Sequence, residues 1–140
     1  MLPARLTRWK GHEVLIKALS LIKYIRFFCV LVGDHDTKRN YKSELENRIK
    51  FQGLTNKVKI TGHCKDMVSA YKISDIVISA SLDPEPFGRI TVEAQAMGCV
   101  VVAADHGGAQ ETIQHNRTGI LVEPRNCLLY TSPSPRDNTT

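Results

Sequence analysis

Two carboxylates eight positions apart, Glu85 and Glu93, flank a Pro-Phe-Gly turn in the second half of the chain. An apolar run at 76–80 precedes them and Gly98 follows, so the order there reads strand, loop, helix and stop. Ligands of open α/β sheets bind at the carboxyl end of a strand, beside the N-terminus of the next helix. Carboxylates accept hydrogen bonds from sugar hydroxyls, and a helix N-terminus attracts phosphate. This combination favours a sugar nucleotide as ligand.

The first turn of that helix supplies further groups for such a ligand. Pro86 suits the start of a helix, and the backbone N–H groups that follow have no intrahelical partner. We expect these donors to meet a phosphate or sugar oxygen, with Glu93 on a ribose and Glu85 on a hexose ring. The alternative is an exposed ion pair between Arg89 and Glu93, which lie one helical turn apart. The backbone N–H groups in question belong to Phe87, Gly88 and Arg89.

Two cations, Arg5 and Lys10, stand between the end of a strand and the start of a helix. Cations oppose the dipole at a helix N-terminus unless an anion lies between them, which predicts a diphosphate. Cations on an exposed loop are the alternative. Gly33 follows the next apolar run in a tight turn, where it would let a ligand approach the backbone; a plain turn is the other interpretation.

These residues need a scaffold of alternating strands and helices, and the sequence pattern predicts one. The predicted fold is α/β: a Rossmann-like parallel sheet with helices on both faces and with the loops after the strands along one edge. Helices are predicted over 12–24, 40–51, 66–73, 88–97 and 110–114. Strands are predicted over 27–32, 58–61, 75–80, 99–103 and 119–122.

Composition excludes several classes of protein. The 140 residues suffice for one domain, and no stretch has the roughly 18 to 20 apolar residues of a membrane-spanning helix. The net charge of +5 comes from cations spread along the chain without a nucleic-acid motif, so we expect no nucleic-acid partner. The four cysteines have neither metal-ligand nor redox spacing, which predicts reduced thiols, a cytoplasmic location and no metal.

Both ends of the sequence suggest an incomplete domain. Residues 2–5 read as the tail of a strand with no partner before it. Residues 127–140 are polar and interrupted by proline, and the run 127–137 resembles translated sequencing-adapter sequence. We therefore expect a domain over 1–126 and a disordered, non-native tail over 127–140.

Taken together, the segments resemble the C-terminal, donor-binding domain of a GT-B fold retaining glycosyltransferase of family 4, also called group 1. The resemblance covers 5–124 in the order and spacing of that family. One departure is Ala4, where the family usually has glycine. The matching segments are Arg5-Leu-Thr-Arg-Trp-Lys-Gly11, Leu31-Val-Gly-Asp34, Ser74-Asp-Ile76, Glu85-Pro-Phe-Gly88, Glu93-Ala-Gln-Ala-Met-Gly98, 101–108 and Gly119-Ile-Leu-Val122.

The resemblance implies a role for each residue singled out above. Arg5 and Lys10 would hold the donor diphosphate and stabilise the leaving group without a metal or other cofactor, and Glu85 would contact the transferred sugar. These three form the expected catalytic set. Glu93 would bind the ribose, with Gly33 and the backbone of 87–89 beside the donor.

The parent enzyme would transfer a sugar from a nucleotide-diphosphate sugar to a glycan or lipid-linked acceptor, with retention, in polysaccharide or lipid-linked glycan synthesis. The resemblance implies that the acceptor domain, the first strand of this domain and its terminal helix are missing here, so the fragment alone is expected to be inactive. The parent is expected to associate peripherally with a membrane. The alternatives are a non-catalytic nucleotide-sugar or phosphate-binding module and a GT-B-type sugar-nucleotide epimerase. An NAD-dependent oxidoreductase is disfavoured, because no Gly-x-Gly-x-x-Gly follows a strand.

Overall fold

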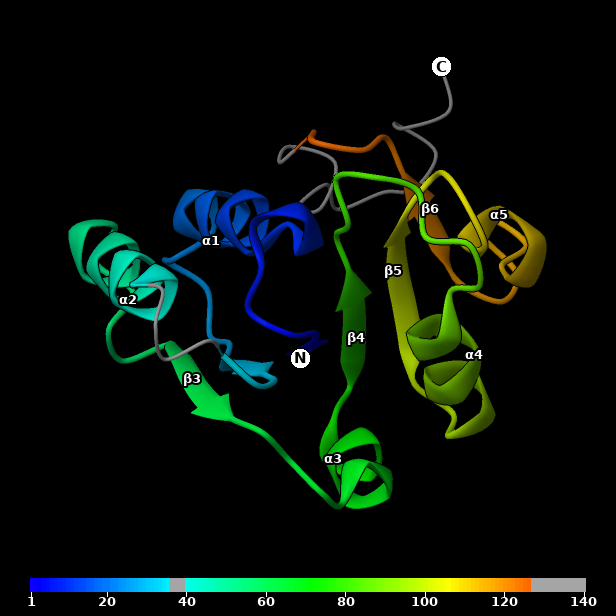
Figure 1. Cartoon of the computed structure of the whole chain (residues 1–140), viewed down its shortest axis with the longest axis horizontal. Coiled ribbons are helices and arrows are strands. Elements are labelled where there is room, and N and C mark those ends of the chain that lie inside the picture. Colours follow the sequence, from blue (N-terminus) through cyan, green and yellow to red (C-terminus); the bar gives the residue numbers. More distant parts are fainter. Residues whose placement is uncertain (36–39, 127–140) are drawn as a thin grey trace.

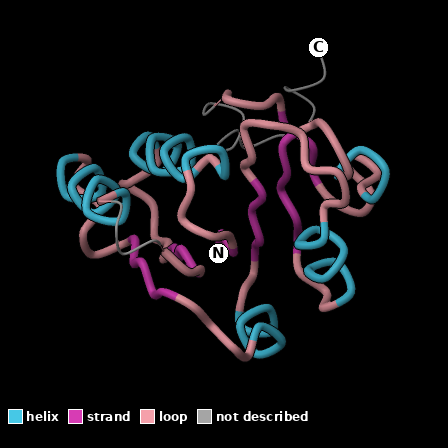
Figure 2. Tube along the Cα trace, viewed as in Figure 1, coloured by secondary structure: helices cyan, strands magenta, loops and turns pink. Residues whose placement is uncertain are grey.

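The computed structural model describes residues 1–35 and 40–126, which alternate between strands and helices (Figures 1 and 2). The predicted tail at 127–140 lies outside the described residues. The helices are α1 (His12–Leu21), α2 (Tyr41–Phe51), α3 (Met67–Ile73), α4 (Arg89–Ala96) and α5 (Ala109–Thr112), and a 3-10 turn, η1, covers Arg8–Lys10. The strands are β1 (Leu2–Pro3), β2 (Cys29–Val32), β3 (Val58–Gly62), β4 (Ile76–Ser79), β5 (Val100–Ala104) and β6 (Ile120–Val122).

The strands form two parallel three-stranded sheets, in the orders β1-β2-β3 and β4-β5-β6. Met1 joins them, because its amino group donates to the carbonyl of Ile76 at 2.8 Å and its carbonyl accepts from the N–H of Ile78 at 2.9 Å. That is the bonding pattern of parallel neighbours. The strands therefore follow one another as β3-β2-β1-β4-β5-β6, the order of a doubly wound fold.

The helices cover both faces of these strands, as the sequence predicted. One core packs α1 and α2 against residues such as Leu2, Leu31 and Ile78, whereas the other packs α3, α4 and α5 against Val77 and Val101. Successive strand residues point to opposite faces, so Val77 and Ile78 belong to different cores. Figure 1 shows α1 and α2 on one side of β4 and β5, and α4 and α5 on the other.

One local prediction needs correction. The first helix ends at Leu21 rather than at 24, because the N–H of Ile22 closes on the carbonyl of Leu19 at 3.1 Å and the chain turns toward β2. The strand tail predicted at residues 2–5 is present as the two-residue strand β1, which pairs with β2. Within the described residues no helix is long and apolar enough to cross a membrane.

Candidate functional site

The loops that follow β1, β2, β4 and β5 meet at the carboxyl edge of the strands. Backbone hydrogen bonds tie them together: the N–H of Leu82 donates to the carbonyl of Trp9 at 2.6 Å, and that of Gly108 donates to Glu85 at 2.6 Å. The N–H of Leu6 also donates to the carbonyl of Asp34 at 2.9 Å. Parallel strands place the groups that follow them at one edge, and here the backbone fixes these loops to one another.

Lys10 and Glu85 form an ion pair at this edge. The Nζ of Lys10 lies 2.6 Å from the Oε1 of Glu85, and the two side chains are only 17% and 18% exposed. Ser81 donates its hydroxyl to the same oxygen at 2.5 Å. His106 adds the next contact, with Nε2 2.8 Å from the carbonyl of Ser81. Since a carbonyl oxygen only accepts, that hydrogen bond requires the proton on Nε2.

This arrangement lowers the pKa of Glu85. Burial on its own raises the pKa of the carboxyl, but the hydrogen bonds from Lys10 and Ser81 and the charge of Lys10 outweigh it. The sequence predicted an anion between Arg5 and Lys10. For Lys10, the carboxylate of Glu85 supplies a negative charge within the chain itself. An ionised carboxylate beside an ammonium group can accept from hydroxyls while the ammonium binds a second anion.

Glu93 lies on α4 and accepts two hydrogen bonds. The Nε of Arg89 is 2.8 Å from its Oε1, and the hydroxyl of Tyr71 is 3.1 Å from its Oε2. The Arg89 side chain is 82% exposed, so the ion pair considered as an alternative is present at the surface. Burial, followed by the bond to Glu93, raises the pKa of the Tyr71 phenol. Glu93 is 39% exposed and remains open to a further partner.

The remaining predicted residues lie around this edge without a direct side-chain link to it. The side chain of Arg5 is exposed, makes no hydrogen bond or ion pair with another described residue, and lines a cavity of about 730 Å³ beside the start of α2. Phe87 is 71% exposed, whereas Gly88 is buried as the N-cap of α4.

Gly33 has a structural reason for being glycine. A Cβ there would lie 1.9 Å from the carbonyl oxygen of Ala4, because the ends of β1 and β2 pass so closely. Gly11, at the end of η1, shows the same constraint, since a Cβ would lie 1.9 Å from the carbonyl oxygen of Ala80. The two glycines therefore bring the loop of residues 4–11 close to the ends of β2 and β4.

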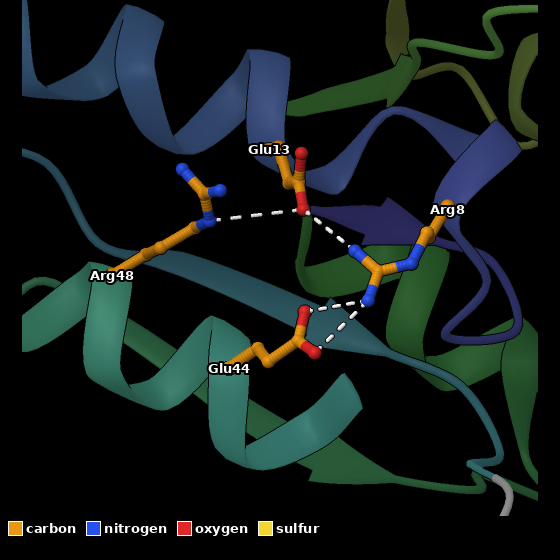
Figure 3. A network of polar contacts seen from close by, with 4 residues as sticks. All are labelled: Arg8, Glu13, Glu44 and Arg48. Atoms are coloured by element: carbon orange, nitrogen blue, oxygen red, sulfur yellow. Dashed lines mark hydrogen bonds and ion pairs between the residues drawn. The ribbon is translucent and has the colours of Figure 1, made fainter. Parts of the chain in front are cut away.

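Sequence reasoning does not single out Arg8, which fixes the same loop to α2 (Figure 3). Its guanidinium Nη2 contacts both carboxylate oxygens of Glu44, at 2.9 and 2.7 Å, and its Nη1 lies 3.3 Å from Glu13. Arg48 approaches Glu13 from α2, and the Arg8 guanidinium stacks 4.7 Å above the ring of Tyr41. Spacing could not reveal this network, because the contact between Arg8 and Glu44 joins residues 36 positions apart.

Ser81, His106 and Thr91 are also missed by spacing alone. Thr91 is buried, donates to the carbonyl of Gly88 at 2.6 Å and lies 3.1 Å from the hydroxyl of Thr112, so it holds the start of α4 against α5. The available signal was a threonine in the first turn of the predicted helix, where its hydroxyl can bond the backbone. In residues 1–35 and 40–126, no group of three His, Cys, Asp or Glu side chains is placed to hold a metal ion.

Comparison with known proteins gives a consistent result. A family model described as Glycosyl transferases group 1 matches residues 2–127. A glycosyltransferase from Rickettsia africae is 45% identical with a TM-score of 0.89, over 93% of this chain and 34% of that one. HepE of Anabaena, solved in complex with UDP and glucose, is 37% identical with a TM-score of 0.88, over 93% of this chain and 35% of HepE.

Curated relatives match in the same way. An uncharacterized glycosyltransferase of Methanocaldococcus jannaschii is 34% identical over 124 residues, which is 87% of this chain and 31% of the relative. The chain spans about a third of the length of the curated relatives it matches. Its parallel sheets and helices match the GT-B fold of the solved relatives, as predicted. The family match over residues 2–127 shows that the chain belongs to the group 1 glycosyltransferases.

Proposed function

We propose that this chain binds the nucleotide-diphosphate sugar of a retaining glycosyltransferase. The observation that carries the proposal is the contact between Lys10 and Glu85, 2.6 Å apart, which places a cation and a carboxylate at one strand edge. A nucleotide sugar needs both: cations for its diphosphate and hydrogen-bond acceptors for its hydroxyls. The relative HepE, solved with UDP and with UDP-glucose, supports this class of ligand.

In the proposed complex, the diphosphate lies between Arg5 and Lys10. Lys10 then shares its charge between the phosphate oxygens and Glu85, and Glu85 turns its free oxygen to a hydroxyl of the transferred sugar. The exposed Arg5, which has no side-chain partner among the described residues, can move to the diphosphate at little cost. Glu93 accepts from the ribose hydroxyls, while the backbone of 87–89 and Gly33 flank the donor.

The transfer itself is proposed for the parent enzyme, since the chain spans about a third of its curated relatives. There the bond between the anomeric carbon and the diphosphate oxygen breaks, and the acceptor hydroxyl bonds to that carbon with retention while its proton passes to the departing diphosphate. Arg5 and Lys10 balance the charge on the departing diphosphate, and no metal is needed for that step. A glycan or lipid-linked acceptor would be held by a separate domain, so the chain alone would be inactive.

Two alternatives use the same site. A non-catalytic module would bind the donor without transfer, and a sugar-nucleotide epimerase would need an acid and a base beside the sugar. His106 is one candidate for a proton carrier beside Glu85, yet its Nε2 is engaged with the carbonyl of Ser81. That contact favours the transferase over the epimerase.

Calorimetric titration of the chain with UDP-glucose, GDP-mannose and NAD tests donor binding. We expect one of the nucleotide sugars to bind and NAD not to bind, and Lys10→Ala to weaken that binding at least tenfold through loss of a charge-assisted contact, worth about 1.5 to 3 kcal/mol. Lys17→Ala, an exposed lysine of α1, serves as the matched control and should bind like the unaltered chain. Affinity for NAD without affinity for any nucleotide sugar would exclude the proposed function.

A further inference from the structure

The positive charge of the chain is concentrated in two segments, 14–33 and 47–65. Together they contain eight of the 19 lysines and arginines and none of the 14 acidic residues. The rest of the chain therefore carries more acidic than basic residues, although the net charge is +5. Lys23, Arg26 and Lys50 are exposed cations of these segments.

Contacts bring the two segments together at the ends of α1 and α2. The Nζ of Lys57 donates to the carbonyl of Ile25 at 2.7 Å and lies 4.8 Å from the ring centre of Phe27. The Nζ of Lys23 is 3.8 Å from the position that a Cβ of Gly53 would take. Figure 1 shows the last turns of α1 and α2 and the start of β3 on the same side of the molecule.

Large apolar side chains are exposed among these cations. Tyr24 is 82%, Phe28 60% and Phe51 88% exposed, and Leu21 and Ile25 are close to half exposed. Cations at helix C-termini are ordinary, because they complement the helix dipole. Exposed aromatic rings clustered with them are not explained in that way, and clustered exposed apolar groups mark interaction surfaces.

We propose that this surface, formed by Lys23, Arg26, Lys50, Tyr24, Phe28 and Phe51, docks the protein on an anionic lipid membrane. Basic side chains near a membrane attract its anionic headgroups, and aromatic rings settle at the interface between headgroups and acyl chains. Without an acidic residue in either segment, nothing in them opposes a negatively charged partner. Nucleic acid would use the cations and could stack its bases on the exposed rings, but it would offer no apolar phase to the aliphatic side chains of Leu21 and Ile25.

The position of the surface is compatible with donor binding. The C-terminal ends of α1 and α2 lead into β2 and β3, so the surface adjoins the amino ends of the strands. Lys10 and Glu85 lie at the opposite, carboxyl edge. The protein can therefore rest on lipid and hold a nucleotide sugar at the same time, and membrane binding does not depend on the proposed donor site.

Co-sedimentation with vesicles tests the proposal. We expect the chain to bind phosphatidylcholine vesicles that contain phosphatidylglycerol, to bind pure phosphatidylcholine much less, and to bind less as salt is raised to about 0.15 M. Two double variants remove the proposed contacts: Lys23→Glu with Lys50→Glu, and Tyr24→Ser with Phe51→Ser. The lysine pair should reduce partitioning at least tenfold, since one basic residue contributes about fivefold. The aromatic pair should reduce it at least tenfold through loss of apolar area buried in the interface. A matched control on α3, Lys72→Glu with Ile73→Ser, alters an exposed cation and an 85% exposed apolar side chain.

The control should bind vesicles like the unaltered chain. Circular dichroism of every variant checks folding, and the milder pair Lys23→Gln with Lys50→Gln replaces any variant that does not fold. No binding of the unaltered chain to the anionic vesicles, or equal binding by the surface variants, would overturn the proposal. So would binding to single-stranded DNA in place of vesicles, which would make the surface a nucleic-acid site.

Discussion

Lys10 and Glu85, 75 positions apart in the sequence, place a nitrogen and an oxygen 2.6 Å from each other where the loops after β1 and β4 meet. The hydrogen bond between Leu82 and Trp9 holds the same two loops together through the backbone. The backbone thus fixes the two loops that carry the ion pair. Removing one charge leaves the other largely shielded from solvent and without its partner. Stability measurements can therefore detect the pair independently of any ligand.

Removing either partner should destabilise the chain more than removing both. We expect Lys10→Met or Glu85→Gln alone to lower the free energy of unfolding by about 1 to 3 kcal/mol, because each leaves a largely buried group unsatisfied. The double variant should recover part of that loss, so the coupling energy of the cycle is favourable. Urea unfolding of the four proteins measures it. Additive losses would mean that the two side chains do not interact in solution.

The same ion pair predicts a pH dependence. The folded protein lowers the pKa of Glu85 below its ordinary value of 4.5, so the unfolded chain takes up a proton first as the pH falls. Glu85 then contributes stability that is complete above the unfolded pKa and is lost as the pH falls through the folded pKa. The difference in unfolding free energy between the unaltered chain and Glu85→Gln should be constant above about pH 5 and shrink below it. A difference that grows on acidification would contradict this assignment.

Gly11 and Gly98 form a matched pair for testing how closely the loop after β1 must approach β4. Both have φ of +81°, but a Cβ on Gly11 would lie 1.9 Å from the carbonyl oxygen of Ala80, whereas nothing lies within 4 Å at Gly98. Gly98→Ala should therefore cost only the backbone strain, about 1 to 2 kcal/mol. Gly11→Ala should lose considerably more or fail to fold, as thermal unfolding would show. Equal losses would indicate that the loop moves freely away from Ala80.

The order of the elements followed from sequence pattern, because local signals decide it. Alternating apolar runs, Gly53 after α2 and Gly98 after α4 mark where elements begin and end. β1 could not be recognised as a complete element, since only Leu2–Pro3 pairs with β2 and one residue, Met1, reaches β4. Its place in the strand order depends on contacts with residues about 30 and 75 positions away, which no local pattern contains.

The candidate site was predicted as a set of residues, but its contacts were not. Parallel strands guarantee that Lys10 and Glu85 share an edge, whereas their direct pairing depends on the conformation of two loops. Ser81 and His106 gave no signal, because serine and histidine near a strand end are common and only geometry connects them to Glu85. The ion pair of Arg89 with Glu93 was foreseen as an alternative, and it coexists with a partly exposed Glu93.

Glu93 gives the sharpest test of the proposed donor geometry. If Glu93 accepts from both ribose hydroxyls, Glu93→Ala in the full-length parent should weaken donor binding by about 2 to 4 kcal/mol, through loss of two charge-assisted hydrogen bonds. Its contact with Arg89 lies at the surface, but Tyr71 is buried and would lose the acceptor of its hydroxyl, so the free energy of unfolding should also fall by about 1 to 3 kcal/mol. Glu111→Ala, an exposed carboxylate of α5, is the control and should bind the donor normally. Titration with a nucleotide sugar and with the free sugar phosphate separates the contributions, because only the former carries a ribose. An unchanged affinity for the nucleotide sugar would place the ribose elsewhere and leave Glu93 with only its contacts to Arg89 and Tyr71 among the described residues.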